Sequence, residues 1–321
     1  MKKMFLMAAL VLMGTTAFAQ QQRTQAQAKT AQRQQVRTAA FLEVYDIETK
    51  QRTVIHEFSP SERMEAPNWS VDGKYLYYNA SGRIYRIPAE GGTPTLINLD
   101  YVTGCNNDHV LSTDGKQIAV SASFKGGRGS YIFIAPIDGG IPRIVTGSTP
   151  SYLHGWSPDG KTIAFCGQRP GKQDMDVWVM DLETGQEKAL TDGGGLDDGP
   201  EYSSDGKTIW FNSVRTGLMQ VWKMNADGSG QTQMTFDEDR NSWFPHISPD
   251  NKKVVYLAYR KGDLEPGQHI GNLNVELRMI PAEGGKPETV VKLFGGQGSI
   301  NVNSWSPDSK KFAFVSYKIV E

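Results

Sequence analysis

The sequence contains very little cysteine, with only Cys105 and Cys166 among 321 residues. Two cysteines form one disulfide at most, which excludes a small fold held together by a disulfide framework. Cys166 stands inside the apolar run TIAFCGQR, and this position favours a core residue over a reactive thiol. The sequence leaves open whether the two cysteines pair.

Long apolar runs and helical periodicity are also missing from most of the chain. After the first 20 residues, no stretch is apolar for long enough to cross a bilayer, so we expect no transmembrane segment. From Phe41 to Glu321, apolar residues do not recur at the spacing of an amphipathic helix. These absences exclude a helical bundle and a membrane protein built from several spanning helices.

Net charge is nearly absent, with 34 basic and 35 acidic residues, but the charges are unevenly placed. Residues 1–40 contain six bases and no acids, which leaves 28 bases, 35 acids and a net charge of −7 for the rest. A mildly acidic body argues against a nucleic-acid-binding surface, so we expect no nucleic-acid partner. We expect the protein to be a monomer.

The first 19 residues, MKKMFLMAALVLMGTTAFA, have the pattern of a secretory signal peptide. Lys2 and Lys3 precede a short apolar run, and Ala17-Phe18-Ala19 is a small-residue cleavage pattern. No cysteine follows the run to carry a lipid anchor. We therefore expect a periplasmic or secreted protein, soluble after cleavage near Ala19.

Residues 20–40, QQQRTQAQAKTAQRQQVRTAA, are rich in glutamine and contain no aromatic and no acidic residue. Such a segment cannot bury enough apolar surface to offset the entropy lost on ordering, so we expect a disordered leader. An alternative hypothesis is that its four basic residues make it a partner-binding arm.

A repeated turn organises residues 41–321. The unit is an apolar or aromatic residue followed by Ser-x-Asp-Gly-Lys, and its six copies, two of them looser, are NWSVDGK (68–74), VLSTDGK (110–116), GWSPDGK (155–161), EYSSDGK (201–207), HISPDNK (246–252) and SWSPDSK (304–310). The aspartates of successive turns are 42, 45, 46, 45 and 58 residues apart. Self-similarity at this period indicates a repeat architecture.

Each unit continues with the same order of strand signals. A β-branched and aromatic run such as TIAFC or TIWFN follows the turn, then an alternating segment such as DVWVMD that ends in glycine, then a short closing segment such as KALTD. Four short strands in about 45 residues, repeated, are typical of β-propeller blades. The sequence therefore predicts an all-β fold.

The ends of the chain predict six blades and a way to close the ring. The sixth unit stops at Glu321 after its second strand, whereas residues 41–58, FLEVYDIETKQRTVIHEF, supply a third and a fourth strand. We expect these N-terminal strands to pair with C-terminal strands within residues 303–321. This leaves no open sheet edge between the first blade and the last.

The repeat resembles the TolB-like, or WD40-like, β-propeller family. The resemblance rests on the Trp-Ser-Pro-Asp-Gly-Lys turns, on the Arg-x-Gly loops SVRTG and GQRPG, and on the Gly-Gly ends of the third strands. It covers residues 41–321. TolB carries a further α/β domain before its propeller, where this sequence has the glutamine-rich leader. The resemblance implies protein partners, but not the role of TolB itself.

Strand order divides the loops between two rims. The Ser-x-Asp-Gly and Gly-Gly turns share one rim, while the inner strands begin at the other, which is more diverse in sequence and thus favoured for a site. An insertion at residues 258–274 accounts for the 58-residue spacing and is predicted to cover this mouth as a lid. The candidate ligand-binding residues at the mouth are Asn106, Asn107, Asp108, His109, His154, Asp197, Asp198, Trp243, His246, His269, Asn301 and Asn303.

These residues support more than one interpretation. The stretch Asn106-Asn107-Asp108-His109 is either part of a site or the polar end of a loop. Residues 197 and 198 are either a pair of carboxylates for acid–base chemistry or part of a solvated loop. Trp243 falls outside the register of the tryptophans next to the turns, so it is a candidate to stack on a ligand. The Arg-x-Gly arginines belong to the repeat, which favours a structural role.

Two functions remain open from the sequence. The first is a module that binds a saccharide, a peptide or an envelope protein at the mouth. The second is a carbohydrate-active enzyme, because secreted propellers similar to this one, the oligogalacturonate lyases, hold a divalent metal through mouth histidines. His109 and His246 come from opposite blades, however, so no cofactor is firmly implied. A serine peptidase is excluded because the sequence contains no Gly-x-Ser-x-Gly motif.

Overall fold

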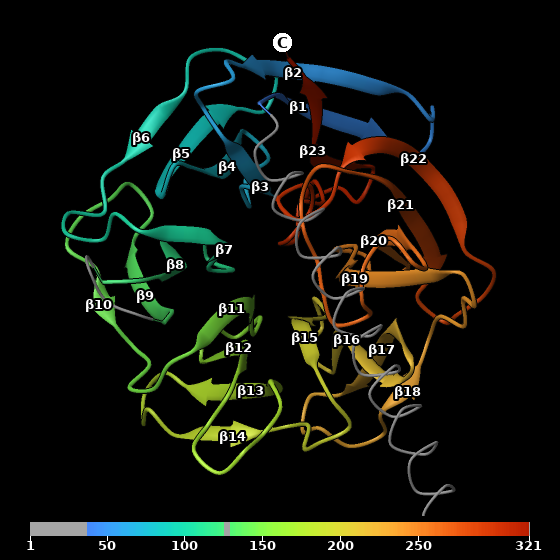
Figure 1. The fold of residues 1–321 in the computed structure, drawn as a ribbon. Coiled ribbons are helices and arrows are strands. Elements are labelled where there is room, and N and C mark those ends of the chain that lie inside the picture. Colours follow the sequence, from blue (N-terminus) through green and yellow to red (C-terminus); the bar gives the residue numbers. More distant parts are fainter. Residues whose placement is uncertain (1–36, 125–128, 321) are drawn as a thin grey trace, which may run out of the picture. The chain divides into compact units, whose positions relative to one another are not determined.

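The structure is a computed structural model that describes residues 37–124 and 129–320. Residues 39–318 form one compact unit of six β-sheets arranged in a ring (Figure 1). The signal peptide and most of the leader expected from the sequence lie outside the described residues. The first strand begins at Thr38, three residues earlier than Phe41, where we expected the propeller to begin.

Five blades are four-stranded antiparallel meanders whose strands follow chain order. Blade one contains β3 (Met64–Trp69), β4 (Tyr75–Ala80), β5 (Arg83–Pro88) and β6 (Thr95–Ile97). Blade two contains β7 (Cys105–Leu111), β8 (Gln117–Ala122), β9 (Tyr131–Pro136) and β10 (Arg143–Ile144). Blade three contains β11 (Ser151–Trp156), β12 (Thr162–Gly167), β13 (Asp176–Asp181) and β14 (Glu187–Ala189). Blade four contains β15 (Asp197–Tyr202), β16 (Thr208–Thr216), β17 (Leu218–Asn225) and β18 (Thr232–Gln233). Blade five contains β19 (Arg240–Ile247), β20 (Lys253–Arg260), β21 (Leu273–Pro281) and β22 (Glu288–Gly295).

Blade six joins the two ends of the chain. Its sheet has the order β2-β1-β23, where β1 is Thr38–Asp46, β2 is Arg52–Phe58 and β23 is Lys311–Ile319. The Ile47 N–H donates to the Lys310 carbonyl at 3.0 Å, and the Ser316 hydroxyl donates to Glu43. The inner segment contributes only a bridge between Trp305 and Phe312. The fold is therefore a six-bladed, all-β propeller, as the repeat predicts.

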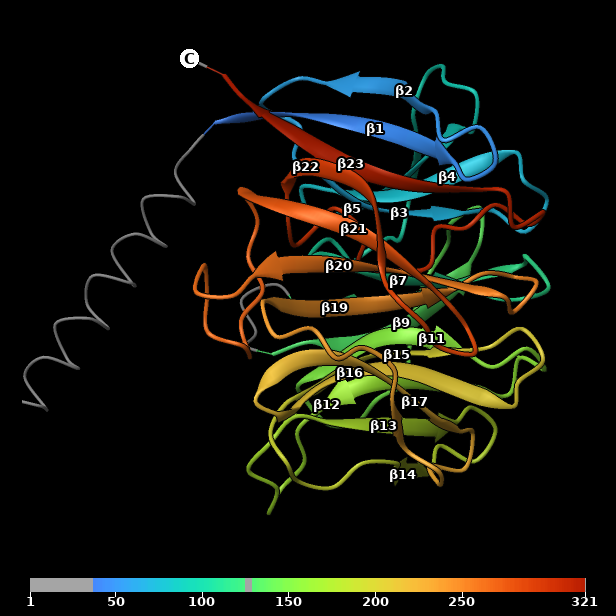
Figure 2. The same ribbon diagram turned by 90° about the vertical axis from the view of Figure 1, so that its right-hand side faces the viewer.

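The core lies between neighbouring blades, because each sheet is covered on both faces. The central strand β12 illustrates this: its last five residues, Ile163 to Gly167, are all buried. A strand buried on both faces needs a continuous apolar run instead of an alternating one, and the second strands of the repeat have this character. Figure 2 shows the sheets stacked around the ring in side view. Among the described residues, no helix is long and apolar enough to cross a membrane.

The repeated turn is held by its own side chains. In the blade-three copy, the Ser157 hydroxyl donates to Asp159 Oδ1 at 2.6 Å and accepts from the Thr162 N–H at 2.8 Å. The Ser157 hydrogen bond, followed by that of the Lys161 N–H, lowers the pKa of Asp159. Gly160 has a φ of 75°, which a residue with a β-carbon rarely adopts. The Ser-to-Asp hydrogen bond recurs in all six turns, so the serine and aspartate side chains on this rim hold the turns together.

Candidate ligand-binding site at the channel mouth

The site is built where the five inner strands begin. Each of these strands has an irregularity in its pairing with the next strand, such as the one between Asp198 and Glu201 in β15. In three blades the residue at this point has a positive φ: Ala66 (55°), Gly199 (63°) and Phe244 (52°). A bulge re-aims the neighbouring side chains. It thus disturbs the simple alternation between residues that face the channel and residues that face the next blade.

Four titratable side chains from four successive blades meet at this mouth: Asp108, His154, Asp198 and His269. His154 Nε2 lies 3.1 Å from Asp198 Oδ1, and His269 Nε2 lies 3.8 Å from Asp198 Oδ2. The Gly199 N–H also donates to Asp198 Oδ1 at 2.7 Å. Asp108, His154 and Asp198 are all more than 90% buried. The structure therefore brings together four of the residues that the sequence placed at the mouth.

The local charges set the protonation of this cluster. Burial alone would lower the pKa of His154, but Asp108 and then Asp198 raise it to about 9. Burial raises the pKa of Asp108 to about 6 against the opposing effect of His154. Burial also acts to raise the pKa of Asp198, but the hydrogen bond and charge of His154 hold it below its usual range. Burial lowers the pKa of His269. At neutral pH the cluster holds two carboxylates and one imidazolium.

Asn106 supports the carboxylate of blade two. Its Nδ2 donates to Asp108 Oδ2 at 2.9 Å, while its Oδ1 accepts from the Asp108 N–H at 3.0 Å. These bonds fix the orientation of the Asp108 carboxylate. Asn107 is buried next to it and shares the ring position of Asp198. Thus Asn106 and Asp108 lie on strand β7 instead of in a loop, and both belong to the candidate site.

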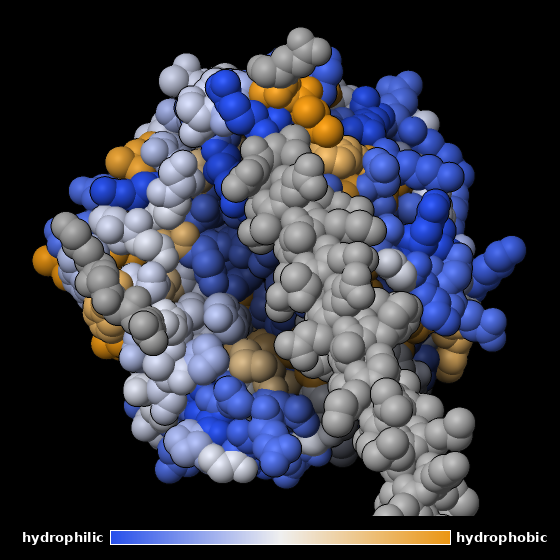
Figure 3. Space-filling model, in the orientation of Figure 1, coloured by the Kyte–Doolittle hydropathy of each residue, from blue (hydrophilic) through white to orange (hydrophobic). Residues whose placement is uncertain are grey.

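The insertion of blade five covers one side of the mouth, which is consistent with the predicted lid. The ring of His269 packs edge-on against Trp243 and Phe244, with centroid distances of 4.4 and 5.1 Å. The Tyr259 hydroxyl donates to the Ile270 carbonyl at 2.8 Å and holds the insertion down. These contacts place the His269 ring beside Asp198. Figure 3 views this rim, whose centre is hollowed and lined by hydrophilic residues where they are visible.

A second segment, residues 296–303, also enters the mouth, where the sequence placed Asn301 and Asn303 but did not predict its irregular backbone. The Gly298 carbonyl accepts from the Ala66 N–H at 2.7 Å, and the Gly298 N–H donates to Asn301 Oδ1 at 2.6 Å. Asn301 and its neighbours Ile300 and Val302 are at most 1% exposed. This inner segment of blade six is therefore irregular backbone packed into the ring, and not a strand. The glycine-rich run GGQGS before it was the available signal.

His246 and Asn303 belong to a separate, buried network. His246 Nδ1 lies 2.6 Å from Glu201 Oε2, and its Nε2 lies 3.1 Å from the Ile300 carbonyl. Asn303 Nδ2 donates to Glu201 Oε1 at 2.5 Å. Both ring nitrogens of His246 thus face oxygen atoms of neighbouring blades. This network ties blades four, five and six together and has a structural role.

Three other predicted site residues point elsewhere. His109 is completely buried, and neither ring nitrogen has a hydrogen-bond partner among the described residues. Burial lowers its pKa to about 4. Trp243 is also fully buried in the core, so it has no face on which a ligand can stack. Asp197 points away from Asp198, as successive strand residues do, and lies 2.7 Å from Arg215 NH2. The two aspartates therefore do not form an acid–base pair.

The Arg-x-Gly arginines have structural partners. Arg169 forms an ion pair with Glu187 at 2.6 Å and stacks on Phe165 and Trp178. Arg215 repeats this arrangement one blade later, on Phe211 and Trp222.

The structure also answers whether the two cysteines pair. Both cysteines are free and buried, on β7 and β12, so they do not pair. Within the described ranges, no three His, Cys, Asp or Glu side chains are arranged to hold a metal ion. Two residues that the sequence reading missed lie close enough to affect the cluster. Glu65 and Tyr152 share the ring position of Asp198, and the Glu65 carboxylate adds to the effects that raise the pKa of Asp108.

Comparison with known proteins identifies the family. Residues 148–279 match the description of the TolB β-propeller domain. A protein of uncharacterised function from Agrobacterium fabrum is 44% identical over 281 residues, which cover 87% of this chain and 93% of that protein. A solved Agrobacterium tumefaciens structure, described as a TolB candidate, has a TM-score of 0.83 at 43% identity and covers 88% of this chain and 99% of that chain. The chain belongs to the TolB-like β-propeller family.

More distant relatives share the fold. The Tol-Pal system protein TolB of Francisella tularensis is 25% identical over 245 residues, which cover 75% of this chain and 54% of that protein. An oligogalacturonate lyase from Vibrio parahaemolyticus has a TM-score of 0.50 at 12% identity, with 88% of this chain and 98% of that chain covered. At this identity the likeness to the lyase shows the fold alone.

Proposed function

We propose that this chain is an exported, periplasmic binding protein whose channel mouth holds a cationic group of a peptide or envelope protein. The observation that carries the proposal is the convergence of Asp108 and Asp198 with one imidazolium, His154, in a nearly buried setting. The Glu65 carboxylate lies nearby but is already paired with Arg63, whose Nε lies 2.7 Å from Glu65 Oε1. A site with more carboxylates than cations favours an ammonium or guanidinium group.

A peptide fits the mouth better than a saccharide does. Sugar recognition uses exposed aromatic faces, but Trp243 and Phe244 are at most 1% exposed. Among the aromatic residues at the ring position of Asp198, only Tyr152 is partly exposed. The name of the Francisella relative, a Tol-Pal system protein, supports an envelope partner, and the basic start and Ala-Phe-Ala pattern of residues 1–19 support export.

Isothermal titration with blocked tripeptides tests the binding function. Peptides with a central lysine or arginine are expected to bind, and their glutamate and citrulline counterparts are not. Asp108→Asn and Asp198→Asn should each weaken binding about tenfold or more, whereas Glu57→Gln, an exposed carboxylate on β2, should leave it unchanged. Equal affinity for the lysine and glutamate peptides would refute a cation site.

An activity assay on the same purified protein distinguishes a binding function from a catalytic one. The enzyme alternative requires turnover of an oligogalacturonate and loss of that turnover with a chelator. Turnover with this sensitivity would replace the binding function with the lyase function. Export is tested by fractionating the native host and sequencing the mature N-terminus, which should begin at Gln20.

A further inference from the structure

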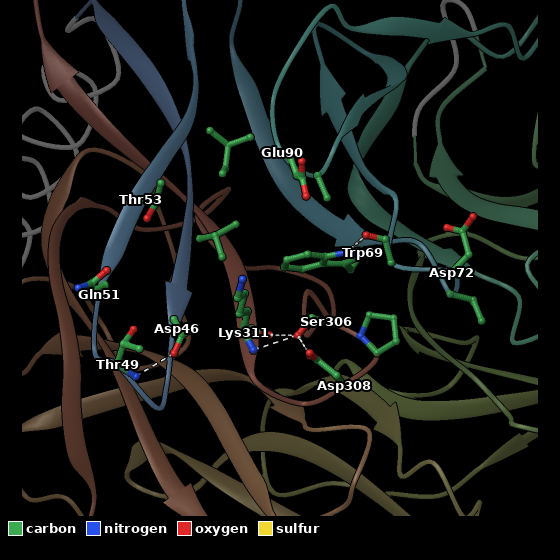
Figure 4. Close-up of a pocket in the computed structure, with 16 residues that line it drawn as sticks. Asp46, Thr49, Gln51, Thr53, Trp69, Asp72, Glu90, Ser306, Asp308 and Lys311 are labelled. Carbon is green, nitrogen blue, oxygen red and sulfur yellow. Dashed lines mark hydrogen bonds between the residues drawn. The ribbon is translucent and has the colours of Figure 1, made fainter.

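A groove between blades six and one lies on the rim opposite to the mouth. Its volume is about 730 Å³, compared with about 340 Å³ between blades one and two and 370 Å³ between blades four and five. The turn Asp46–Gln51 and strand β2 form one side, and the turns at Trp69–Gly73 and Ala89–Glu90 form the other (Figure 4). The blade six–one groove is therefore about twice as large as its counterparts.

In each of the two smaller grooves, a basic side chain of the protein reaches across to the next blade. Arg86 NH1 lies 2.6 Å from Asp138 Oδ1, and the guanidinium lies over the Tyr75 ring at 4.9 Å. Lys223 Nζ donates to the Ala282 carbonyl at 3.1 Å and lies over the Trp210 ring at 5.5 Å. The protein thus fills these grooves with a cation held by an aromatic face and an acceptor.

The blade six–one groove has no basic side chain at the position of Arg86, but it keeps an acidic residue at the position of Asp138 and gains an aromatic surface from a different position. Arg86 and Lys223 each stand two residues before the end of the third strand, and Val44 occupies this position in β1. Glu90, at the position of Asp138 in the following blade, has no ion-pair partner among the described residues. An aromatic surface comes from Trp69, where the smaller grooves have leucine or isoleucine.

The groove is lined mainly by negative charge, which favours a cation at the position that Val44 leaves without one. Four carboxylates line it, and Lys311 is the one cation in its lining, as far as the described residues go. Figure 4 shows Glu90 and the Trp69 ring on the same side, across from Thr53 and Asp46. Trp69 is fixed because its Nε1 donates to the Gly73 carbonyl at 2.9 Å. The carboxylates belonging to the turns are Asp46, Asp72 and Asp308.

We infer that the blade six–one groove binds an extended peptide segment of a partner protein through an arginine or lysine side chain. This side chain takes the place that Arg86 fills in the next groove, lying against Trp69 and pairing with Glu90. The groove is on the opposite rim from the mouth, so this site is independent of the proposed function. Its predicted ligand is a cation on a short extended segment.

The test uses the full chain and the blocked pentapeptide Ala-Thr-Arg-Thr-Ala, with citrulline in place of arginine as the uncharged probe. Binding is followed by the fluorescence of Trp69 relative to a Trp69→Leu variant, and affinity is measured by calorimetry. The arginine peptide should bind to the wild type at least about tenfold more tightly than the citrulline peptide. Glu90→Gln should reduce the affinity by about the same factor.

Val44→Arg is the decisive variant, because it restores the internal cation of the neighbouring grooves. The new arginine should pair with Glu90 and abolish the Trp69 signal of the arginine peptide, while binding of this peptide at the mouth persists. Val179→Arg, the same change at the equivalent position of blade three, is the matched control and should bind as the wild type does. If Val44→Arg does not fold, the affinity of Glu90→Gln for the arginine peptide alone tests the groove site.

A variant at the mouth distinguishes the two sites experimentally. Asp108→Asn should leave the Trp69 signal and the groove affinity unchanged, whatever the fate of the mouth proposal. The groove site is overturned if the arginine and citrulline peptides bind equally, if Glu90→Gln binds as the wild type does, or if the signal depends on Asp108.

Discussion

His154 is predicted to make the stability of the propeller fall as the pH rises above neutral. Its pKa is about 9 in the folded chain and about 6.5 when unfolded, so the folded state binds the extra proton between these values. A group whose pKa is raised on folding stabilises fully below its unfolded pKa and loses this contribution as the pH passes the folded one. The contribution is about 3 kcal/mol, since each pH unit is worth about 1.4 kcal/mol.

The assay is urea unfolding followed by fluorescence at pH 6, 7, 8, 9 and 10, for the wild type and for His154→Gln. Other groups titrate in this range as well, so the informative quantity is the difference in free energy of unfolding between the two proteins at each pH. This difference should be largest at pH 6 and shrink by about 3 kcal/mol toward pH 10. The loss of stacking on Phe244, at a centroid distance of 5.7 Å, adds a cost that does not depend on pH.

The result would refute the reasoning if the difference stayed constant from pH 6 to pH 10. That outcome would mean that His154 is neutral in the folded chain and that Asp108 and Asp198 do not hold its proton. Asp198→Asn supplies the control from the other side of the pair. It should remove much of the pH dependence while leaving the imidazole in place.

Three more perturbations test other parts of the structure. His109→Leu should raise the free energy of unfolding by about 1–2 kcal/mol at pH 7, because it removes two buried nitrogens without partners. Because the pKa of His109 is lowered to about 4, the wild type should lose about 3 kcal/mol of stability as the pH falls from 6.5 to 4, and the leucine variant should not lose it. The same urea midpoint for both proteins at pH 4.5 would contradict this. Phe312→Ala should cost about 3–5 kcal/mol in urea unfolding, because the ring is fully buried between Tyr45, Trp305 and Phe314, and a loss below 1 kcal/mol would refute this packing. Neither cysteine should react with a thiol reagent in the native protein and both should react in denaturant, whereas a single disulfide would leave none to react.

The architecture could be predicted from the sequence because its register is set locally. Each Ser-x-Asp-Gly turn makes its hydrogen bonds within five residues, so the sequence marks the end of every inner strand. Counting back from the turn then places Asp108, His154 and Asp198 at one end of the channel. The prediction of six blades needed nothing beyond this count and the strands at the two ends.

The facing of individual side chains could not be predicted, because it depends on bulges and on contacts between distant blades. The pairing irregularity between Cys105 and His109 changes the alternation along β7, and the His109 ring is buried. His246 binds Glu201 from another blade, 45 residues away. The entry of residues 296–303 into the ring depends on an irregular backbone that no periodic pattern signals.

The sharing of blade six between the two ends of the chain has a consequence for the order of folding. Glu43 and Ser316, which meet in this blade, are 273 residues apart in sequence. During synthesis, the edge of β1 that pairs with β23 therefore stays unpaired until nearly the whole chain has been made. Contacts between such distant residues form slowly because a very long loop must close first. A chain of this design completes its ring only after β23 has emerged, so any factor that holds the chain unfolded until then protects the exposed edge of β1.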